Sequence, residues 1–148
     1  MPIAVAVCRT AAVNFIAYSG RITEADLGPL LRFYQADGAA AAKRDEIHVY
    51  ESGTDLSGVS RAALEGFRAG LAEALAHERL QLTPRAAFVC HEPACLPVIA
   101  EWFDVAGEDD ALGAQRRRFP SVTAAADWLY LEASTVFEIE DVRRARAA

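Results

Sequence analysis

The sequence lacks several features that would point directly to a cellular role. No apolar run reaches membrane-spanning length without a charge, and the apolar start, Met1 to Val7, is short and has no positively charged lead. We therefore expect neither a membrane span nor a secretory signal. The net charge of −6 provides no surplus of lysine and arginine for phosphate contacts, so we also expect no nucleic-acid partner.

Cysteine is scarce and odd in number. Cys8, Cys90 and Cys95 cannot all pair, and reduced thiols in a cytoplasmic protein explain them most simply. The segment from Cys90 to Cys95 is a candidate zinc site because it contains a histidine as well as two cysteines. A structural zinc site needs about four ligands, however, and the sequence offers no second pair with matching spacing. We predict no metal and no cofactor.

The composition is that of one globular domain. Of 148 residues, 53% are hydrophobic and 24% charged, which is enough apolar material to build a core. Alternating apolar residues over Ile3–Val7 and Val13–Ala17 predict an antiparallel hairpin. Further strands are predicted at Ile47–Val49 and Ala86–Cys90, with a short edge strand at Arg118–Phe119.

Helical spacing of apolar residues predicts the helices between these strands. The first could be capped by Thr23, which places Pro29 inside the helix, or by Asp26, which places Pro29 in the first turn, where no backbone donor is needed. We favour the second interpretation, with a short turn before the helix. Beyond Ser134 we predict a strand with Phe137 and Ile139 on one side. The four predicted helices contain Leu27–Tyr34, Leu64–Leu75, Leu96–Phe103 and Val122–Leu129.

This order predicts an α/β fold. Right-handed crossovers would give a single mixed, mostly parallel sheet with an N-terminal β-hairpin, covered by about four helices. We assign residues 1–133 to this domain and residues 134–148 to a C-terminal extension that contacts a partner or a second copy in a homodimer.

The segment from Ser52 to Ser60 is the first candidate site. It follows a buried strand and opens a helix, which is where α/β proteins usually place binding residues. Asp55, Ser57 and Ser60 could form a partner-binding surface, and either serine could accept a phosphate. The structural alternative is that one serine caps the helix and Asp55 is a turn residue, and we favour it.

Histidines supply the second set of candidates. His91 and Glu92 follow another predicted strand and could line a cleft beside Asp55. Neither an oriented partner nor a nucleophile accompanies them, so we expect no catalysis. His48 alternates with Ile47 and Val49, which predicts that it lies on the less buried face of its strand in a structural role.

Aromatic residues could line an apolar pocket between helices and sheet. Trp102, Phe103 and Trp128 are the candidates, although residues at helical spacing are more often plain core.

Three segments together resemble the STAS fold, and in particular the bacterial SpoIIAA-like families, which share their architecture with CRAL-TRIO lipid-carrying domains. Gly20–Leu27 is similar to the entry to the first helix of these families. Ile47–Leu64 corresponds to the region that carries the phosphorylated serine of anti-anti-sigma factors, and Phe119–Leu129 is similar to their closing helix. The Asp-Ser-Ser-Gly type site itself is absent, because this chain has Asp55-Leu56-Ser57-Gly58 there.

The resemblance, over roughly residues 3–131, implies a non-enzymatic regulatory module that docks a protein partner through the Ser52–Ser60 segment. The lipid-carrying relatives imply an alternative, which is a carrier of a small apolar ligand in a cavity between helices and sheet. A hydrolase or transferase using His91 and Glu92 is the least favoured reading.

Overall fold

A computed structural model of the chain describes residues 2–37, 39–75, 84–107 and 115–147. Five strands form one sheet in the order β1-β2-β4-β6-β7, in which β1 runs antiparallel to β2 and every other neighbouring pair is parallel. The predicted α/β fold, hairpin and edge strand are therefore confirmed. The strands are β1 (Ile3–Val7), β2 (Val13–Tyr18), β4 (Asp45–Tyr50), β6 (Arg85–Cys90) and β7 (Gln115–Phe119).

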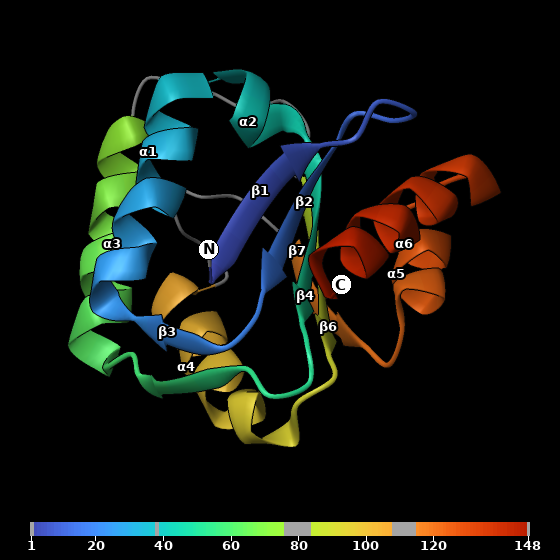
Figure 1. The fold of residues 1–148 in the computed structure, drawn as a ribbon. Coiled ribbons are helices and arrows are strands. Elements are labelled where there is room, and N and C mark those ends of the chain that lie inside the picture. Colours follow the sequence, from blue (N-terminus) through green and yellow to red (C-terminus); the bar gives the residue numbers. More distant parts are fainter. Residues whose placement is uncertain (1, 38, 76–83, 108–114, 148) are drawn as a thin grey trace.

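Helices cover both faces of the sheet (Figure 1). The three crossover helices, α1, α3 and α4, lie on one face, and α5 and α6 lie on the other. The short helix α2 and the helix α6 were not predicted. The helices are α1 (Leu27–Asp37), α2 (Ala39–Lys43), α3 (Arg61–Ala74), α4 (Leu96–Ala106), α5 (Val122–Trp128) and α6 (Ala133–Ala147).

Side chains of the central strands divide between two cores because successive residues point to opposite faces. In β4, Ile47 and Val49 belong to the core under α5 and α6, whereas Tyr50 belongs to the core under α1, α3 and α4. His48 points to the same side as Tyr50 and is only 7% exposed. This is the less buried face, as predicted, since Ile47 and Val49 are fully buried, but His48 is buried as well because helices cover both sides of this strand.

The start of α1 combines the two predicted arrangements. Thr23 caps a short 3-10 turn, Glu24–Asp26, and its backbone N–H donates to Asp26 Oδ2 at 2.7 Å. Helix α1 begins directly afterwards at Leu27. Pro29 therefore lies in the first turn, as favoured, where its missing donor costs nothing.

The segment after β4 is more ordered than the sequence suggested. A tight turn in which Gly53 adopts a positive φ of 83° leads into β5 (Asp55–Gly58). This strand pairs in parallel with β3 (Arg21–Thr23) to form a separate two-stranded sheet. The prediction of a loop missed this pairing, because it joins residues more than 30 positions apart.

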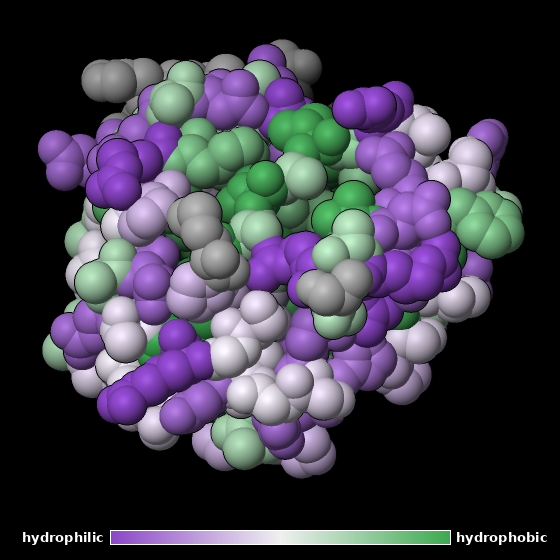
Figure 2. Space-filling model, in the orientation of Figure 1, coloured by the Kyte–Doolittle hydropathy of each residue, from purple (hydrophilic) through white to green (hydrophobic). Residues whose placement is uncertain are grey.

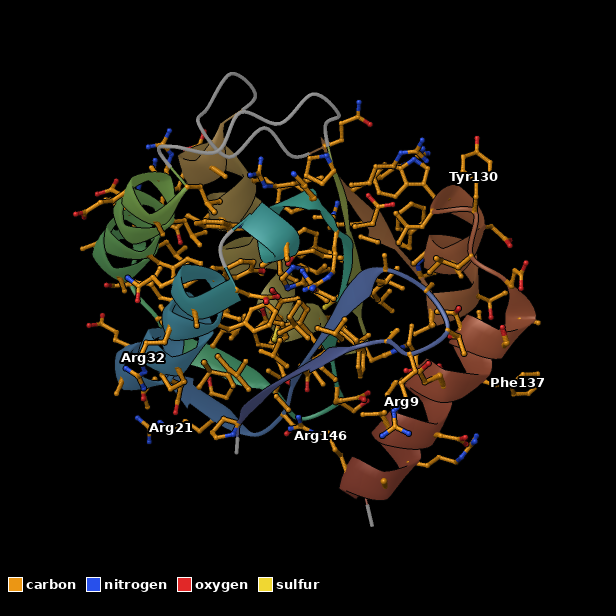
Figure 3. The ribbon with its side chains drawn as sticks, turned by 90° about the horizontal axis from the view of Figure 1, so that it is seen from above. Arg9, Arg21, Arg32, Tyr130, Phe137 and Arg146 are labelled. Carbon is orange, nitrogen blue, oxygen red and sulfur yellow. The ribbon has the colours of Figure 1, made fainter. Side chains whose placement is uncertain are left out.

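Residues 133–147 form helix α6, so the predicted strand around Phe137 and Ile139 was wrong. Residues two apart lie on nearly opposite sides of a helix. Ile139 is accordingly fully buried and Phe137 is 68% exposed, pointing away from the body of the molecule (Figure 3). Glu138 accepts hydrogen bonds from the backbone N–H groups of Arg9 at 2.7 Å and Thr10 at 3.0 Å, which fixes α6 to the β1–β2 turn.

The exposed face in Figure 2 mixes apolar and polar residues: apolar side chains reach the surface in its middle and hydrophilic ones surround them. Among the described residues, the large hydrophobic side chains with high exposure are Val7, Tyr130 and Phe137. Val7 ends β1, Tyr130 follows α5, and Phe137 lies in α6.

Candidate binding cavity

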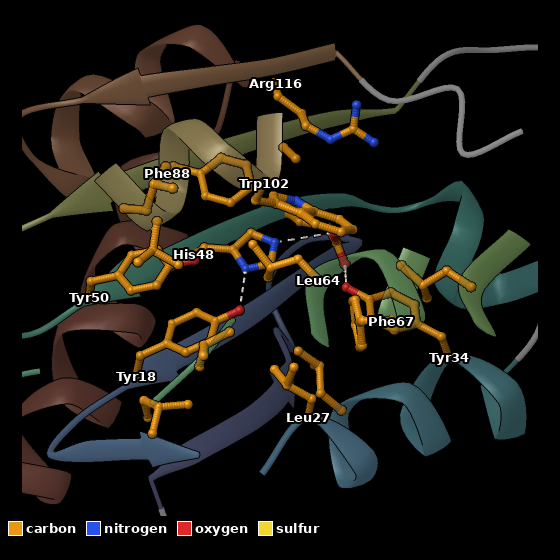
Figure 4. A pocket seen from close by; sticks show the side chains of 18 of the residues that line it. Tyr18, Leu27, Tyr34, His48, Tyr50, Leu64, Phe67, Phe88, Trp102 and Arg116 are labelled. Carbon is orange, nitrogen blue, oxygen red and sulfur yellow. Dashed lines mark hydrogen bonds and ion pairs between the residues drawn. The ribbon is translucent and has the colours of Figure 1, made fainter. Parts of the chain in front are cut away.

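A cavity of about 120 Å³ lies between the sheet and the layer of α1, α3 and α4 (Figure 4). Its walls are mostly leucine, isoleucine, valine and aromatic side chains, which leave little for water to bind. The sheet forms the opposite side, where strands β2, β4 and β6 present polar and aromatic side chains. Helix residues that line the cavity include Leu27, Leu30, Leu64, Phe67, Ile99 and Trp102.

A chain of hydrogen-bonded polar side chains borders this apolar space. The Tyr18 hydroxyl lies 2.9 Å from His48 Nδ1, and His48 Nε2 lies 3.3 Å from Glu46 Oε1. All three residues line the cavity. Glu46 and His48 face the same way because they are two residues apart in β4, and β2 pairs with β4 in the register that places Tyr18 beside Tyr50.

Glu46 is the point on which several donors converge. Its Oε2 accepts hydrogen bonds from the Tyr34 hydroxyl and, at 3.1 Å, from Asn14 Nδ2. Burial by itself raises the pKa of Glu46, but the hydrogen bond and the electrostatic interaction with His48, together with the hydrogen bonds from Tyr34 and Asn14, outweigh this effect, and the pKa is lowered. Glu46 is therefore a carboxylate at neutral pH, held beside an apolar space.

The chain of hydrogen-bonded side chains continues from Glu46 toward the surface. Asn14 is fully buried, and its Oδ1 accepts a hydrogen bond from Arg44 Nη1 at 3.1 Å. The same Arg44 nitrogen contacts Asp37 Oδ2 at 2.6 Å, where both side chains are partly exposed. Asn14 thus links Glu46 to Arg44, which does not contact Glu46 directly.

Aromatic rings pack around the histidine. The His48 ring stacks on Phe88 with 4.5 Å between centroids, and Tyr18 stacks on Tyr50 at 4.2 Å. These contacts hold the imidazole and the phenol in fixed orientations. On the helix side, Phe67 and Trp102 meet edge to face at 5.6 Å.

The phenols of the cavity are hydrogen-bonding groups, not nucleophiles. Burial raises the pKa of Tyr18 well above its ordinary value, and burial together with the Glu46 charge does the same for Tyr34. Both remain protonated at neutral pH. The arrangement can hold a ligand by shape and hydrogen bonds.

The predicted surface at Asp55, Ser57 and Ser60 is exposed, and each of its hydrogen bonds within the chain has a structural role. Asp55 Oδ1 accepts from the backbone N–H of Ser57 at 2.9 Å, which is the expected turn interaction. The Ser60 hydroxyl oxygen accepts from Ala63 N at 3.1 Å and caps α3, as favoured. Whether this surface docks a partner or accepts a phosphate stays a prediction.

His91 and Glu92 lie at the end of β6, away from the cavity lining. Glu92 Oε1 accepts from Gly53 N at 2.9 Å, and the buried Nε2 of His91 has no hydrogen-bond partner among the described residues. The two residues contact the turn before Asp55, and their lining of a cleft there stays a prediction. The Cys95 thiol contacts Thr54 O at 3.3 Å, and no described group of three histidine, cysteine or acidic residues could hold a metal.

The aromatic pocket candidates are separated by the sheet. Trp102 lines the cavity, and Phe103 packs in the same core but is not part of the lining. Trp128 packs against Phe119 on the opposite face, so its assignment to this pocket was wrong. The cavity lies under α1, α3 and α4, and α5 takes no part in it.

Sequence reasoning missed the polar members of the cavity. These members are Tyr18 in β2 and Glu46, His48 and Tyr50 in β4, with Asn14 beneath them, and all alternate with residues of the opposite core. Polar residues at every second position of strands that are covered on both faces were the available signal.

No family model, curated protein or solved structure matched this chain. The SpoIIAA-like resemblance therefore stays a prediction that rests on its motifs. No helix in the described ranges combines the length and apolar character that crossing a bilayer requires.

Proposed function

We propose that this protein binds a small, largely apolar molecule in the cavity between the sheet and helices α1, α3 and α4. The single observation that carries this function is a cavity of about 120 Å³ with apolar helix walls and a buried Tyr18–His48–Glu46 chain along its sheet side. Ligand sites commonly pair an apolar lining with a few oriented polar groups.

The cavity volume limits the size of the buried part of the ligand. An engineered apolar cavity of roughly 150 Å³ in another protein binds benzene. A cavity of about 120 Å³ therefore suits a group of similar or slightly smaller size. A larger ligand would extend part of its body beyond the cavity.

Toluene titration followed by ¹H–¹⁵N NMR tests this function. We expect saturable shifts of amides in β4, α3 and α4, with a Kd of about 1 mM or tighter, or about 4 kcal/mol of binding free energy. Val98→Phe should abolish these shifts, because Val98 of α4 lines the cavity and the larger ring would fill it.

Val105→Phe is the matched control. Val105 is also partly buried on α4 and packs on the same core, but it does not line the cavity. This variant should still bind toluene. Absence of toluene binding to the wild-type protein, or equal binding by Val98→Phe, would contradict the proposed function.

A protein-docking role is a second candidate, favoured by the exposure of Asp55 and Ser57 on the short strand β5. Phosphate on Ser57 would add negative charge beside Asp55 and alter contact with a partner. Ser57→Asp should then change the affinity of any partner recovered with the wild-type protein, and an unchanged affinity would count against this role.

A further inference from the structure

In the buried chain of hydrogen-bonded side chains, the groups at the outer end determine which atoms donate and which accept. A guanidinium can only donate, so the Asn14 oxygen faces Arg44 Nη1 at 3.1 Å. Asn14 Nδ2 then faces the backbone carbonyl of Ala41 at 3.2 Å, and a carbonyl can only accept. Two partners with fixed roles therefore orient the Asn14 amide.

The same argument gives the donor and acceptor roles at Glu46 and His48. Asn14 Nδ2 and the Tyr34 hydroxyl donate to Glu46 Oε2, and the other carboxylate oxygen faces His48 Nε2 at 3.3 Å. A carboxylate can only accept, so His48 Nε2 carries a hydrogen. In a neutral imidazole Nδ1 is then an acceptor, and the hydroxyl of Tyr18, 2.9 Å away, donates to it.

The polar hydrogens of the Asn14 amide, of the Tyr18 and Tyr34 hydroxyls and of the neutral His48 ring are consequently engaged within the protein. A ligand can still find hydrogen-bond acceptors in the hydroxyl oxygens of Tyr18 and Tyr34 and in the Glu46 carboxylate. These three residues line the cavity, whereas Asn14 is fully buried beneath them. A ligand that brings a donor satisfies these acceptors, but a ligand with only an acceptor must break an existing hydrogen bond.

Arg116 is placed on the far side of Trp102 from His48 (Figure 4), and its Nη1 donates to Gly107 O at 3.1 Å. Two further arginines that line the cavity donate to groups of the protein: Arg44 Nη1 to Asn14 and Asp37, and Arg85 Nη1 to the backbone carbonyl of Trp128. The Tyr50 hydroxyl can act in either role, so it does not select between donors and acceptors.

We infer that the ligand carries a hydrogen-bond donor, a hydroxyl or an amino group, on its apolar body, and that Tyr18, Tyr34 and Glu46 accept from it. This inference rests on the proposed function of the cavity. It names the ligand class as small apolar alcohols, phenols or amines, and disfavours compounds whose polar group only accepts.

Three probes of similar size test the inference on the unmodified protein at pH 8. Phenol can donate, benzonitrile can only accept, and toluene has no polar group. We expect phenol to bind roughly tenfold tighter than benzonitrile, which corresponds to ~1.4 kcal/mol. Equal affinity for the two, or tighter binding of benzonitrile, would overturn the inference.

The probes also separate this inference from the proposed function. If toluene binds but phenol shows no advantage over benzonitrile, the cavity binds ligands and the inference fails. If none of the three binds, the proposed function fails.

Glu46→Gln supplies an independent readout, because it replaces one acceptor oxygen beside the cavity by an amide group that can donate to a ligand. Its ratio of phenol to benzonitrile affinity should fall at least threefold, while toluene affinity, which also reports that the protein is folded, should change less than twofold. A ratio that stays at the wild-type value would contradict the assignment of the acceptors.

Discussion

The hydroxyl oxygen of Tyr18 lies 2.9 Å from His48 Nδ1, and the two buried side chains come from neighbouring parallel strands, β2 and β4. This contact joins the apolar core to a polar chain that runs through Glu46 and Asn14 to Arg44. This chain of hydrogen-bonded side chains determines the polarity of the cavity, and it contributes to the stability of the sheet.

Removing the Tyr18 hydroxyl should destabilise the protein. Tyr18→Phe keeps the ring stacked on Tyr50 but leaves His48 Nδ1 buried without its partner. We expect the free energy of unfolding in urea to fall by about 1–3 kcal/mol. Tyr130→Phe is the control, because Tyr130 is 83% exposed and should change stability by less than about 0.5 kcal/mol. Equal stability of Tyr18→Phe and the wild type would contradict the role of this contact.

Acid should weaken the fold through Glu46. Because its pKa in the folded protein is below the ordinary value of about 4.3, the folded state binds this proton less tightly than the unfolded state does. The stabilisation is present above pH ~4.3 and is lost as the pH falls through the lower folded value. Urea unfolding between pH 6 and pH 3 should show this loss.

Glu46→Gln should make the acid dependence of stability shallower and lower the stability at pH 7. Glu132→Gln is the control, because Glu132 is exposed on the segment before α6. If Glu46→Gln reproduces the wild-type pH profile, the carboxylate does not carry the effect.

Helix α6 should depend on the ion pair between Arg143 and Glu51. Arg143 Nε and Nη2 contact the two Glu51 oxygens at 2.8 Å and 2.7 Å, and the side chains are only 19% and 27% exposed. Arg143→Met should cost about 1–2 kcal/mol and speed hydrogen exchange of α6 amides. Arg144→Met on the same helix removes a pair whose side chains are 67% and 70% exposed, and it should have little effect. Equal exchange rates in the two variants would argue against the Arg143 contact.

Ser60 should act as a helix cap. Ser60→Ala removes the acceptor for Ala63 N and should lower the free energy of unfolding by about 1 kcal/mol. Ser60→Asp should keep most of the stability, because aspartate is also a good cap. Ser57→Ala should change stability by less than about 0.5 kcal/mol. A loss as large in Ser57→Ala as in Ser60→Ala would show that the cap is not the cause.

The three thiols should differ in reactivity. Burial raises the pKa of the Cys8 and Cys95 thiols to about 11, and both side chains are buried, whereas Cys90 is partly exposed. At pH 8 a thiol reagent should modify one residue rapidly in the native protein, and Cys90→Ser should remove that phase. Rapid modification in Cys90→Ser would mean that another thiol becomes accessible.

Local patterns in the sequence predicted most of the strands and helices. Period-two alternation predicted the β1–β2 hairpin, helical spacing predicted the faces of α3 and α4, and the expectation that one serine caps a helix is confirmed at Ser60. Each of these signals acts over a few neighbouring residues, which is why it can be read without coordinates. The strand predicted near Ile139 failed because two apolar residues are too few to separate a strand period from a helical one.

The cavity is a different case. The sequence by itself determined that β4 carries Glu46, His48 and Tyr50 at alternate positions, and therefore on one face. Only the tertiary structure decided that this face looks into an apolar cavity, that Tyr18 and Asn14 of β2 stand beside it, and that Tyr34 reaches it from α1. These contacts join residues 12 to 32 positions apart. Strand order and helix packing set such distances, and no local pattern in the chain encodes them.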